Sequence, residues 1–315
     1  MLWNLLPRWL GSMSPRVRAW LQLLRVPNLL TVPGDAMSGV ALGALCGGIA
    51  TGPAPFFFTA AGVVFLYAFG LILNDLHDVD EDRRLRPHRP LASGTISKDR
   101  ARVSLAASLI VGLVCALLAG PFAAVMAGVL VLLIITYTNI LPRGSLMASI
   151  CMGLCRGGSM LIGAAATVTF WPVALPALGL TGAVASITRV AAHETHRHTF
   201  EKREFLPLAW MATTFLVGIV LASVSNVQGI FVVLALLCVT PGLISAWRAS
   251  RMLGRHRVAP QAIQAVVGTH IRALIPLQAG LLVLAGKPLP VGLGIFLAVV
   301  FFPLSWMLGK QFYAS

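Results

Sequence analysis

Long apolar stretches alternate with short polar segments along almost the whole chain. An α-helix needs about 20 apolar residues to cross roughly 30 Å of hydrocarbon, and many of these stretches have that length. The pattern therefore predicts an all-α, polytopic transmembrane bundle of nine to ten helices. The alternative to ten spans is a partly re-entrant segment at 261–286, which carries His270 and Arg272. The ten expected spans are 28–50, 55–78, 102–120, 122–141, 145–168, 171–191, 206–224, 228–247, 261–286 and 288–309.

The composition agrees with this pattern. Hydrophobic residues make up 57% of the 315 residues and charged residues 11%, with a mean hydropathy of +0.86. Soluble domains carry about 25% charged residues, so an ordinary water-soluble globule is excluded. No stretch indicates a separate soluble domain. We expect a single integral membrane domain over 1–315, in which 1–27 is a cytoplasmic amphipathic N-terminal segment rather than a cleaved signal.

The net charge of +14 comes from Lys and Arg residues that gather between the apolar stretches. Basic clusters lie in 1–27, 83–102, 189–203 and 248–257. Because cytoplasmic loops carry an excess of positive charge, all four clusters are placed on the cytoplasmic side. We therefore expect a multi-pass protein of the cell (inner) membrane, whose charge serves orientation in the lipid bilayer and not the binding of nucleic acid.

Half of the ten acidic residues lie within 74–82, at the end of the second expected span. Around a helix, Asp75 and Asp82 nearly superimpose and Asp78 lies beside them, so three carboxylates line one face. Such like charges repel one another, and a divalent cation relieves the repulsion. Oxygen ligands of this kind suit Mg²⁺. These three aspartates are therefore predicted to be catalytic metal ligands; the alternative is a solvated acidic helix end that pairs with its neighbouring arginines.

An arginine-rich segment, 83–94, follows the aspartates and is stiffened by two prolines. Arg86 and Arg89 lie in it, and a guanidinium group can donate two hydrogen bonds at once to phosphate oxygens. A metal ion beside arginines can stabilise the negative charge that builds on a departing diphosphate. The segment therefore predicts a diphosphate-bearing substrate.

These two segments together resemble the first signature of the UbiA-type membrane prenyltransferase superfamily. The resemblance rests on N-D-x-x-D-x-x-x-D from residue 74, on R-P-x-R-P-x-x-S-G from residue 86, and on R-V-P-N at 25–28. It implies a UbiA-like bundle with a cytoplasmic cap from the loops after the second and sixth helices. It also implies magnesium-dependent transfer of a prenyl group from a prenyl diphosphate donor to a small-molecule acceptor. The positions that match metal-diphosphate and substrate positions are Asn28, Asn74, Asp75, Asp78, Asp82, Arg86 and Arg89.

Family members carry a second Asp-rich motif after the sixth span, and here the sequence departs from the pattern. The segment 186–201 contains no aspartate. Glu194 and Glu201, seven residues apart, stack on one helical face, and His193 and His196 would add nitrogen ligands or a proton-transfer group. A degenerate second metal site and a basic, solvated cytoplasmic loop are both consistent with these residues.

A third interpretation is that Arg189 and Arg197 replace the second metal with fixed positive charge. The departure, together with G-L-C-R-G at 153–157, resembles the EboC-like branch of the superfamily. That branch implies a secondary-metabolite precursor as the acceptor. Arg189, His193 and Glu194 are accordingly candidate substrate-binding residues.

Polar residues inside an apolar span are costly and usually face a cavity. Arg156, midway along the fifth span, would bind an acceptor carboxylate or phosphate, or else be satisfied by nearby carbonyls. Asp35 is expected to pair with a buried arginine, the alternative being a place in the cavity lining. Tyr137 would stack on a carbocation-like prenyl group or anchor the interface. Arg143 follows the same span and is a further substrate-binding candidate.

The function expected from these observations is prenyl transfer to a lipophilic or secondary-metabolite acceptor within the membrane. A related transferase with a phosphorylated sugar donor is the alternative among enzymes. A cation-coupled transporter is the alternative outside them, because carboxylates in membrane helices often serve transport. Transporters usually bind their ligands near the midplane and show internal repeats, whereas these aspartates lie at a helix end.

Overall fold

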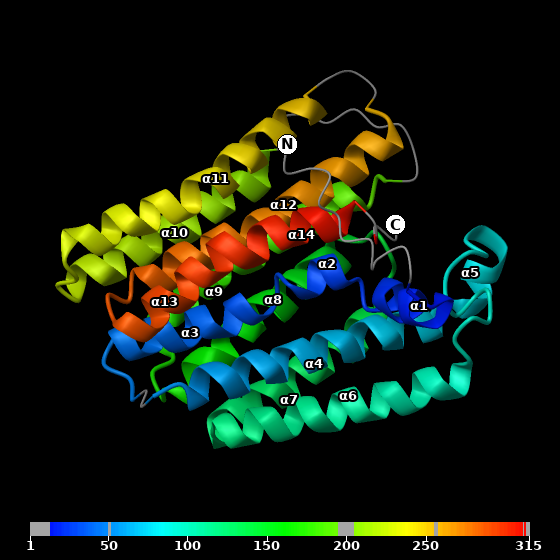
Figure 1. Cartoon of the computed structure of the whole chain (residues 1–315), viewed down its shortest axis with the longest axis horizontal. Coiled ribbons are helices and arrows are strands. Elements are labelled where there is room, and N and C mark those ends of the chain that lie inside the picture. The colour runs from blue at the N-terminus through cyan, green and yellow to red at the C-terminus, as the bar shows by residue number, and fades with distance from the viewer. Residues whose placement is uncertain (1–12, 50–51, 195–204, 255–257, 311, 313–315) are drawn as a thin grey trace.

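The computed structural model describes residues 13–49, 52–194, 205–254, 258–310 and 312. Its regular elements are helical throughout these ranges, as the spacing of apolar residues predicts (Figure 1). They are α1 (Pro15–Leu23), α2 (Val26–Leu29), α3 (Pro33–Leu45), α4 (Ala54–His77), α5 (Val79–Leu85), α6 (Lys98–Ala119), α7 (Pro121–Asn139), α8 (Leu146–Ala166), α9 (Trp171–Ala191), α10 (Leu206–Val224), α11 (Gly229–Leu253), α12 (Pro260–Val283), α13 (Pro288–Phe296), the π-helical η4 (Leu297–Phe301) and α14 (Phe302–Gly309).

Nine helices in the described part of the chain are long and apolar enough to cross a membrane, when the continuous run from α13 to α14 is counted as one. This confirms the expected nine to ten spans. The segment 261–286, for which a re-entrant path was the alternative, is largely one continuous helix, α12, of spanning length. The expected span that is absent from these nine helices is the one at 28–50.

The first expected span is broken into α2 and α3. Arg25 adopts a left-handed conformation with φ of 43° before α2, and Pro33 starts α3, which is only 13 residues long. Proline has no N–H to continue the preceding helix, so the break falls just before it. The carbonyl of Thr31 at this break is free to accept hydrogen bonds from other helices.

The bundle is built around α12, which packs against α3, α9, α10, α11 and the last helix. In the most apolar 18-residue window of α12, 89% of the residues are buried, whereas in that of α7 only 17% are. The inner helices therefore form the core, and α6, α7 and the last helix present most of their apolar side chains outward. An outer apolar surface of this kind fits lipid rather than water.

Two reciprocal glycines let α3 and α8 touch backbone to backbone. A Cβ on Gly39 of α3 would overlap the carbonyl oxygen of Met160, and a Cβ on Gly163 of α8 would overlap that of Ala36. Small residues at helix contacts are the usual means of close approach in membranes. Glycine at 163 is therefore a packing requirement.

At the polar end of the bundle, α5 continues beyond the end of α4 and α1 packs beside that end (Figure 1). The segment after α4, which is one half of the predicted cap, lies at this end. The other half, the loop after the sixth predicted span, falls within 195–204 and lies outside the described residues. The complete cap stays a prediction.

Candidate active site

The aspartate segment lies where α4 passes into α5. Helix α4 ends at His77, Asp78 occupies the junction and α5 starts at Val79, while the amide of Asp82 still donates to the carbonyl of Asp78 at 2.8 Å. All three candidate ligands are buried, with Asp75 5%, Asp78 8% and Asp82 5% exposed. Burial of carboxylates requires charged or hydrogen-bonding partners, and arginines supply them.

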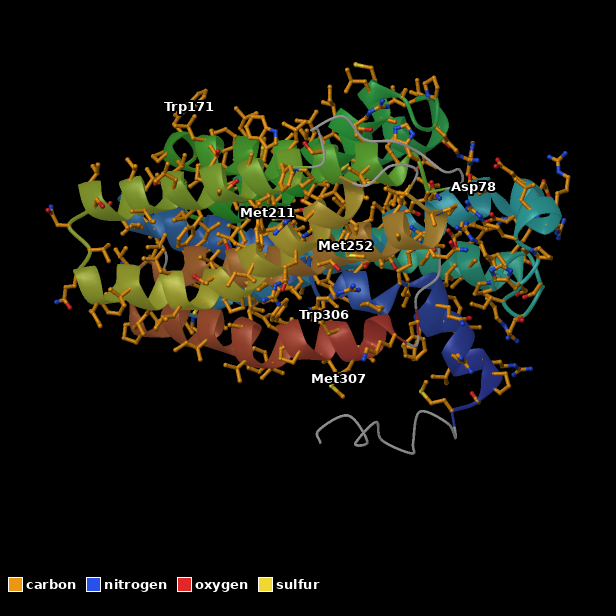
Figure 2. All side chains as sticks on the ribbon, turned by 90° about the horizontal axis from the view of Figure 1, so that it is seen from above. Asp78, Trp171, Met211, Met252, Trp306 and Met307 are labelled. Atoms are coloured by element: carbon orange, nitrogen blue, oxygen red, sulfur yellow. The ribbon has the colours of Figure 1, made fainter. Side chains whose placement is uncertain are left out.

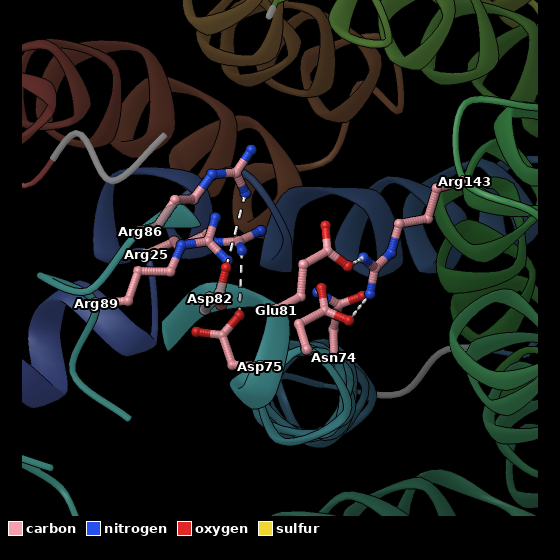
Figure 3. A network of polar contacts seen from close by, with 9 residues as sticks. Arg25, Asn74, Asp75, Glu81, Asp82, Arg86, Arg89 and Arg143 are labelled. Atoms are coloured by element: carbon pink, nitrogen blue, oxygen red, sulfur yellow. Dashed lines mark hydrogen bonds and ion pairs between the residues drawn. The ribbon is translucent and has the colours of Figure 1, made fainter. Parts of the chain in front are cut away.

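Asp75 and Asp82 share one group of arginines (Figure 3). Arg25 Nη2 lies 3.3 Å from Asp75 Oδ1, and Arg89 Nη1 lies 2.8 Å from Asp82 Oδ2. Arg86 approaches Asp82 more loosely, at 4.0 Å. The Arg89–Asp82 pair is nearly inaccessible to solvent, with side chains 9% and 7% exposed, so it is the most deeply buried ion pair of the group.

Asp78 belongs to a second group. Asn74 Nδ2 donates to Asp78 Oδ2 at 3.1 Å, and Arg143, from the turn between α7 and α8, contacts both Asp78 and Glu81. Figure 3 shows Asn74, Glu81 and Arg143 on the side away from Arg25, Arg86 and Arg89. Arg143, predicted only from its place after a span, thus connects the α7–α8 turn to the aspartate segment.

The sequence predicted that the carboxylates of Asp75, Asp78 and Asp82 converge on one metal ion, whereas the structure holds them in two groups. Among the described residues, no group of three or more His, Cys, Asp or Glu side chains is arranged to hold a metal ion. The arginines draw Asp75 and Asp82 to one side, and Arg143 with Asn74 draws Asp78 to the other. The acidic helix end is paired with arginines, as the alternative had it, but Asp75, Asp78 and Asp82 are buried rather than solvated, and the metal site stays a prediction.

Two cavities lie near the aspartates, and Arg25 lines both. The first contains about 720 Å³ of space not filled by atoms and is mostly apolar, with Asn74 at its polar end. The second contains about 830 Å³ and is lined by Asn28, Arg86, Arg89 and Glu194 among others. A polar space beside an apolar one suits a molecule with a charged head and a hydrocarbon tail.

The apolar cavity lies among α4, α7 and α8 and extends to Arg156. Tyr67 and Tyr137 line it from α4 and α7. Tyr137 is therefore in a position to contact a ligand in this cavity as well as to serve as an anchor. Tyr67 was not among the predicted residues; its spacing of seven from Asn74, two helical turns, places the two on one face of α4.

Glu194 belongs to the segment in which the sequence departs from the second Asp-rich motif. It lines the polar cavity opposite the first motif. Burial raises the pKa of its carboxyl group, and the positive charges of Arg86 and Arg25 lower it to a smaller extent. The two motifs, more than a hundred residues apart in the sequence, are thus brought to one space. Arg25, like Tyr67, was left out of the predicted site, although R-V-P-N at 25–28 was the available signal.

Other candidates from the second motif lie elsewhere or outside the described residues. Arg189 donates through Nη1 to the carbonyl of Gly144 at 2.7 Å, and is not among the residues lining the two cavities above. The amide of His193 donates to the carbonyl of Val190 at 3.1 Å. His196, Arg197 and Glu201 fall within 195–204, which the structure leaves undescribed.

Arg156 is held by a buried polar cluster at the far end of the apolar cavity. Its Nε lies 2.8 Å from Asp35 Oδ2, which confirms the expected pairing of Asp35 with an arginine. Its Nη2 donates to the carbonyl of Thr31 at 2.6 Å. Gln278 Nε2 donates to the same carbonyl at 2.7 Å and to Asp35 Oδ1 at 2.5 Å. The cluster joins α3, α8 and α12 at the break before Pro33.

Known proteins resemble this chain in sequence and in fold. The sequence model of the UbiA prenyltransferase family matches residues 36–252. A digeranylgeranylglyceryl phosphate synthase of Ignicoccus hospitalis is 30% identical over 154 residues, which are 49% of each chain. The chain spans about half the length of the first curated relatives it matches, namely 49%, 44% and 58%.

Solved structures share the architecture at low sequence identity. A structure of digeranylgeranylglyceryl phosphate synthase aligns over 87% of this chain and 100% of its own, with a TM-score of 0.59 and 18% identity. A UbiA homologue from Archaeoglobus fulgidus, bound to DMAPP and Mg²⁺, aligns over 82% of this chain and 99% of its own, with a TM-score of 0.54 and 17% identity. These likenesses establish the fold alone.

Proposed function

The chain belongs to the UbiA prenyltransferase family, and from that premise we propose that it transfers a prenyl group from a prenyl diphosphate to a lipophilic acceptor in the membrane. The observation that carries the proposal is that Arg25 lines two neighbouring cavities of different character. One cavity is rich in arginine and the other is apolar, and the buried aspartates lie beside the arginines that line the polar one. A prenyl diphosphate has the matching division into an anionic head and a hydrocarbon tail.

The aspartates fit a magnesium ion by their chemistry. Mg²⁺ takes oxygen ligands and is usually held by one or two carboxylates together with water and substrate phosphate. Asp78 Oδ1 is buried and forms an ion pair with Arg143, so this oxygen is held in charged form beside the other aspartates. In place of their arginine partners, Asp75, Asp78 and Asp82 would hold the ion, which when bound would neutralise charge on the diphosphate. The relative from Archaeoglobus fulgidus was solved with DMAPP and Mg²⁺, which supports this assignment.

The arginines bind and orient the head of the donor. Arg86 and Arg89 line the polar cavity and can each present a planar pair of donors to phosphate oxygens. Arg25 lies at the boundary, where the diphosphate would meet the first carbon of the chain. Preorganised positive groups of this kind stabilise developing negative charge without reorganising during the reaction. Glu194 faces the same space and is the candidate for a second acidic contact.

The tail and the acceptor occupy the apolar cavity. The bond between the first prenyl carbon and the bridging oxygen breaks, and the oxygen keeps the electron pair and leaves as part of diphosphate. A nucleophilic atom of the acceptor forms the new bond to that carbon and loses its proton. Tyr67 and Tyr137 line the cavity, and their ring faces can stabilise positive charge on the prenyl group.

The relatives' name points to a glyceryl phosphate lipid as the first acceptor to test. The secondary-metabolite acceptor implied by the EboC-like resemblance, and the cytoplasmic location of the site, stay predictions. A phosphorylated sugar donor is the competing donor class for the same assay.

The decisive experiment supplies labelled geranylgeranyl diphosphate and a membrane-lipid extract to the purified protein in lipid nanodiscs, with and without Mg²⁺. We expect a labelled product that requires both the donor and Mg²⁺. Asp78→Ala should abolish product formation while the protein remains folded in the membrane, and Asp99→Ala, at an exposed position, should retain it. Undiminished turnover by Asp78→Ala, or labelling only from a phosphorylated sugar, would refute the proposal.

A further inference from the structure

Arg143 differs from the other arginines near the aspartates in what it can reach. It contacts the carboxylates of Asp78 and Glu81, and Figure 3 shows it on the side of Glu81 and Asn74. Unlike Arg25, it is not among the residues that line the polar or the apolar cavity. A diphosphate in the polar cavity can therefore become a partner of the arginines in its lining, whereas the partners of Arg143 are carboxylates.

The turn that carries Arg143 is held both by its own backbone and by α9. The amide of Ser145 donates to the carbonyl of Pro142 at 3.2 Å, which closes the turn. Gly144, inside the turn, has a φ of 70°, a conformation that favours glycine. Arg189 of α9 donates to the carbonyl of Gly144 at 2.7 Å. The backbone that presents Arg143 is thus fixed from two sides.

The end of α9 that supports this turn lies at the same end of the bundle as Asp78. Figure 2 shows Asp78 at the end away from Trp171, the first residue of α9. Arg189 belongs to the last turn of that helix. Arg189, which was predicted to bind substrate, therefore supports the contact between Arg143 and Asp78 through the turn between α7 and α8.

The ion pair with Arg143 uses the same carboxylate that a metal ion would need. Asp78 is buried; Arg143 pairs with its Oδ1, and Asn74 Nδ2 donates to its Oδ2 at 3.1 Å. Protein groups thus engage both oxygens. A metal ion at this carboxylate would lie beside the guanidinium group, and two positive charges repel each other. Binding of the ion and the contact with Arg143 therefore weaken one another.

Glu81 gives Arg143 a second carboxylate that it can keep. The side chains of this pair are 52% and 50% exposed. Exposed ion pairs contribute little to stability, so this part of the contact can rearrange at small cost. Arg143 can therefore leave Asp78 without becoming an isolated charge.

We infer that Arg143 is a positioning residue that competes with the metal ion for Asp78. It contacts Asp78 and Glu81 together, keeps only Glu81 when the ion binds, and favours release of the ion by returning to Asp78. The inference rests on the proposed function, because it needs Asp78 as a metal ligand. It adds to that function a residue that keeps metal binding weak enough to be reversed in each turnover.

The test measures metal binding rather than turnover. Mn²⁺, which accepts the same oxygen ligands as Mg²⁺, is titrated into the detergent-purified full chain, and free Mn²⁺ is followed by electron paramagnetic resonance. We expect Arg143→Gln to bind Mn²⁺ about tenfold more tightly than the unchanged protein, because the variant no longer has to break a charged hydrogen bond. A merely structural role of Arg143 would lower the affinity, so the direction of the change separates the two roles.

Arg83→Gln is the matched control. The Arg83 side chain is 53% exposed, close to the value for Arg143, but its ion pair is with Asp80, at 3.1 Å. We expect its replacement to leave the Mn²⁺ affinity unchanged. An equal gain in both variants would reveal a general effect of charge and would overturn the inference, as would an unchanged or lower affinity in Arg143→Gln.

The labelled-product assay separates failure of this inference from failure of the proposed function. A Mg²⁺-dependent product from the unchanged protein, together with equal Mn²⁺ affinities of that protein and Arg143→Gln, would overturn the inference alone. Mn²⁺ binding that Asp78→Asn leaves undiminished would refute the proposed metal site, and the inference with it.

Discussion

Removal of the negative charge at Asp35 tests whether the buried cluster around Arg156 holds the bundle together. Asp35 is 0% and Arg156 6% exposed, and the ion pair between them measures 2.8 Å. Asp35→Asn retains an oxygen that can accept the hydrogen bond from Gln278, so the change is mainly the loss of charge. A guanidinium group is then left buried without its counter-ion, which costs about 3–5 kcal/mol in comparable buried pairs.

The assay is the free energy of unfolding measured by SDS titration in mixed micelles. We expect Asp35→Asn to lower it by that amount, and Asp99→Asn to change it little. Asp99 also forms an ion pair, with Arg102 at 2.9 Å, but its side chain is 88% exposed, and exposed pairs contribute little. The double substitution Asp35→Asn with Arg156→Met removes the orphaned charge and should be more stable than Asp35→Asn alone. Equal effects of Asp35→Asn and Asp99→Asn would refute the reasoning.

Two further predictions concern the polar cavity. Arg89→Lys loses the planar pair of donors, so kcat/KM for the prenyl diphosphate should fall about 10- to 100-fold. Arg100→Lys, at an exposed position, should leave kcat/KM unchanged. Equal kcat/KM values for the two variants would contradict a phosphate contact by Arg89. Burial raises the pKa of Glu194 above 4.5, so its contribution to stability is largest below pH 4.5 and is lost as the pH rises through the folded-state pKa. The assay is the thermal unfolding midpoint measured against pH, and we expect Glu194→Gln to reduce its decline with rising pH. Parallel midpoint-versus-pH curves for the variant and the unchanged protein would contradict this prediction.

The sequence alone was sufficient to predict the membrane bundle and the residues of the first motif. Runs of apolar residues as long as those of α4, α6 and α7 have one stable backbone arrangement in hydrocarbon, the helix with all its hydrogen bonds internal. The acidic cluster can also be recognised from the sequence alone, because five of only ten acidic residues in the 315-residue chain lie within 74–82. The family resemblance rested on that same short segment.

Only the tertiary structure decided how these residues are paired. Asp35 and Arg156 are 121 positions apart, and their contact depends on the close approach of α3 and α8 that Gly39 and Gly163 permit. The aspartates divide into two groups because Arg25 and Arg143 reach them from different parts of the chain. Helical periodicity describes one helix at a time, and it carries no information about which distant cation will neutralise a carboxylate once the helices have packed.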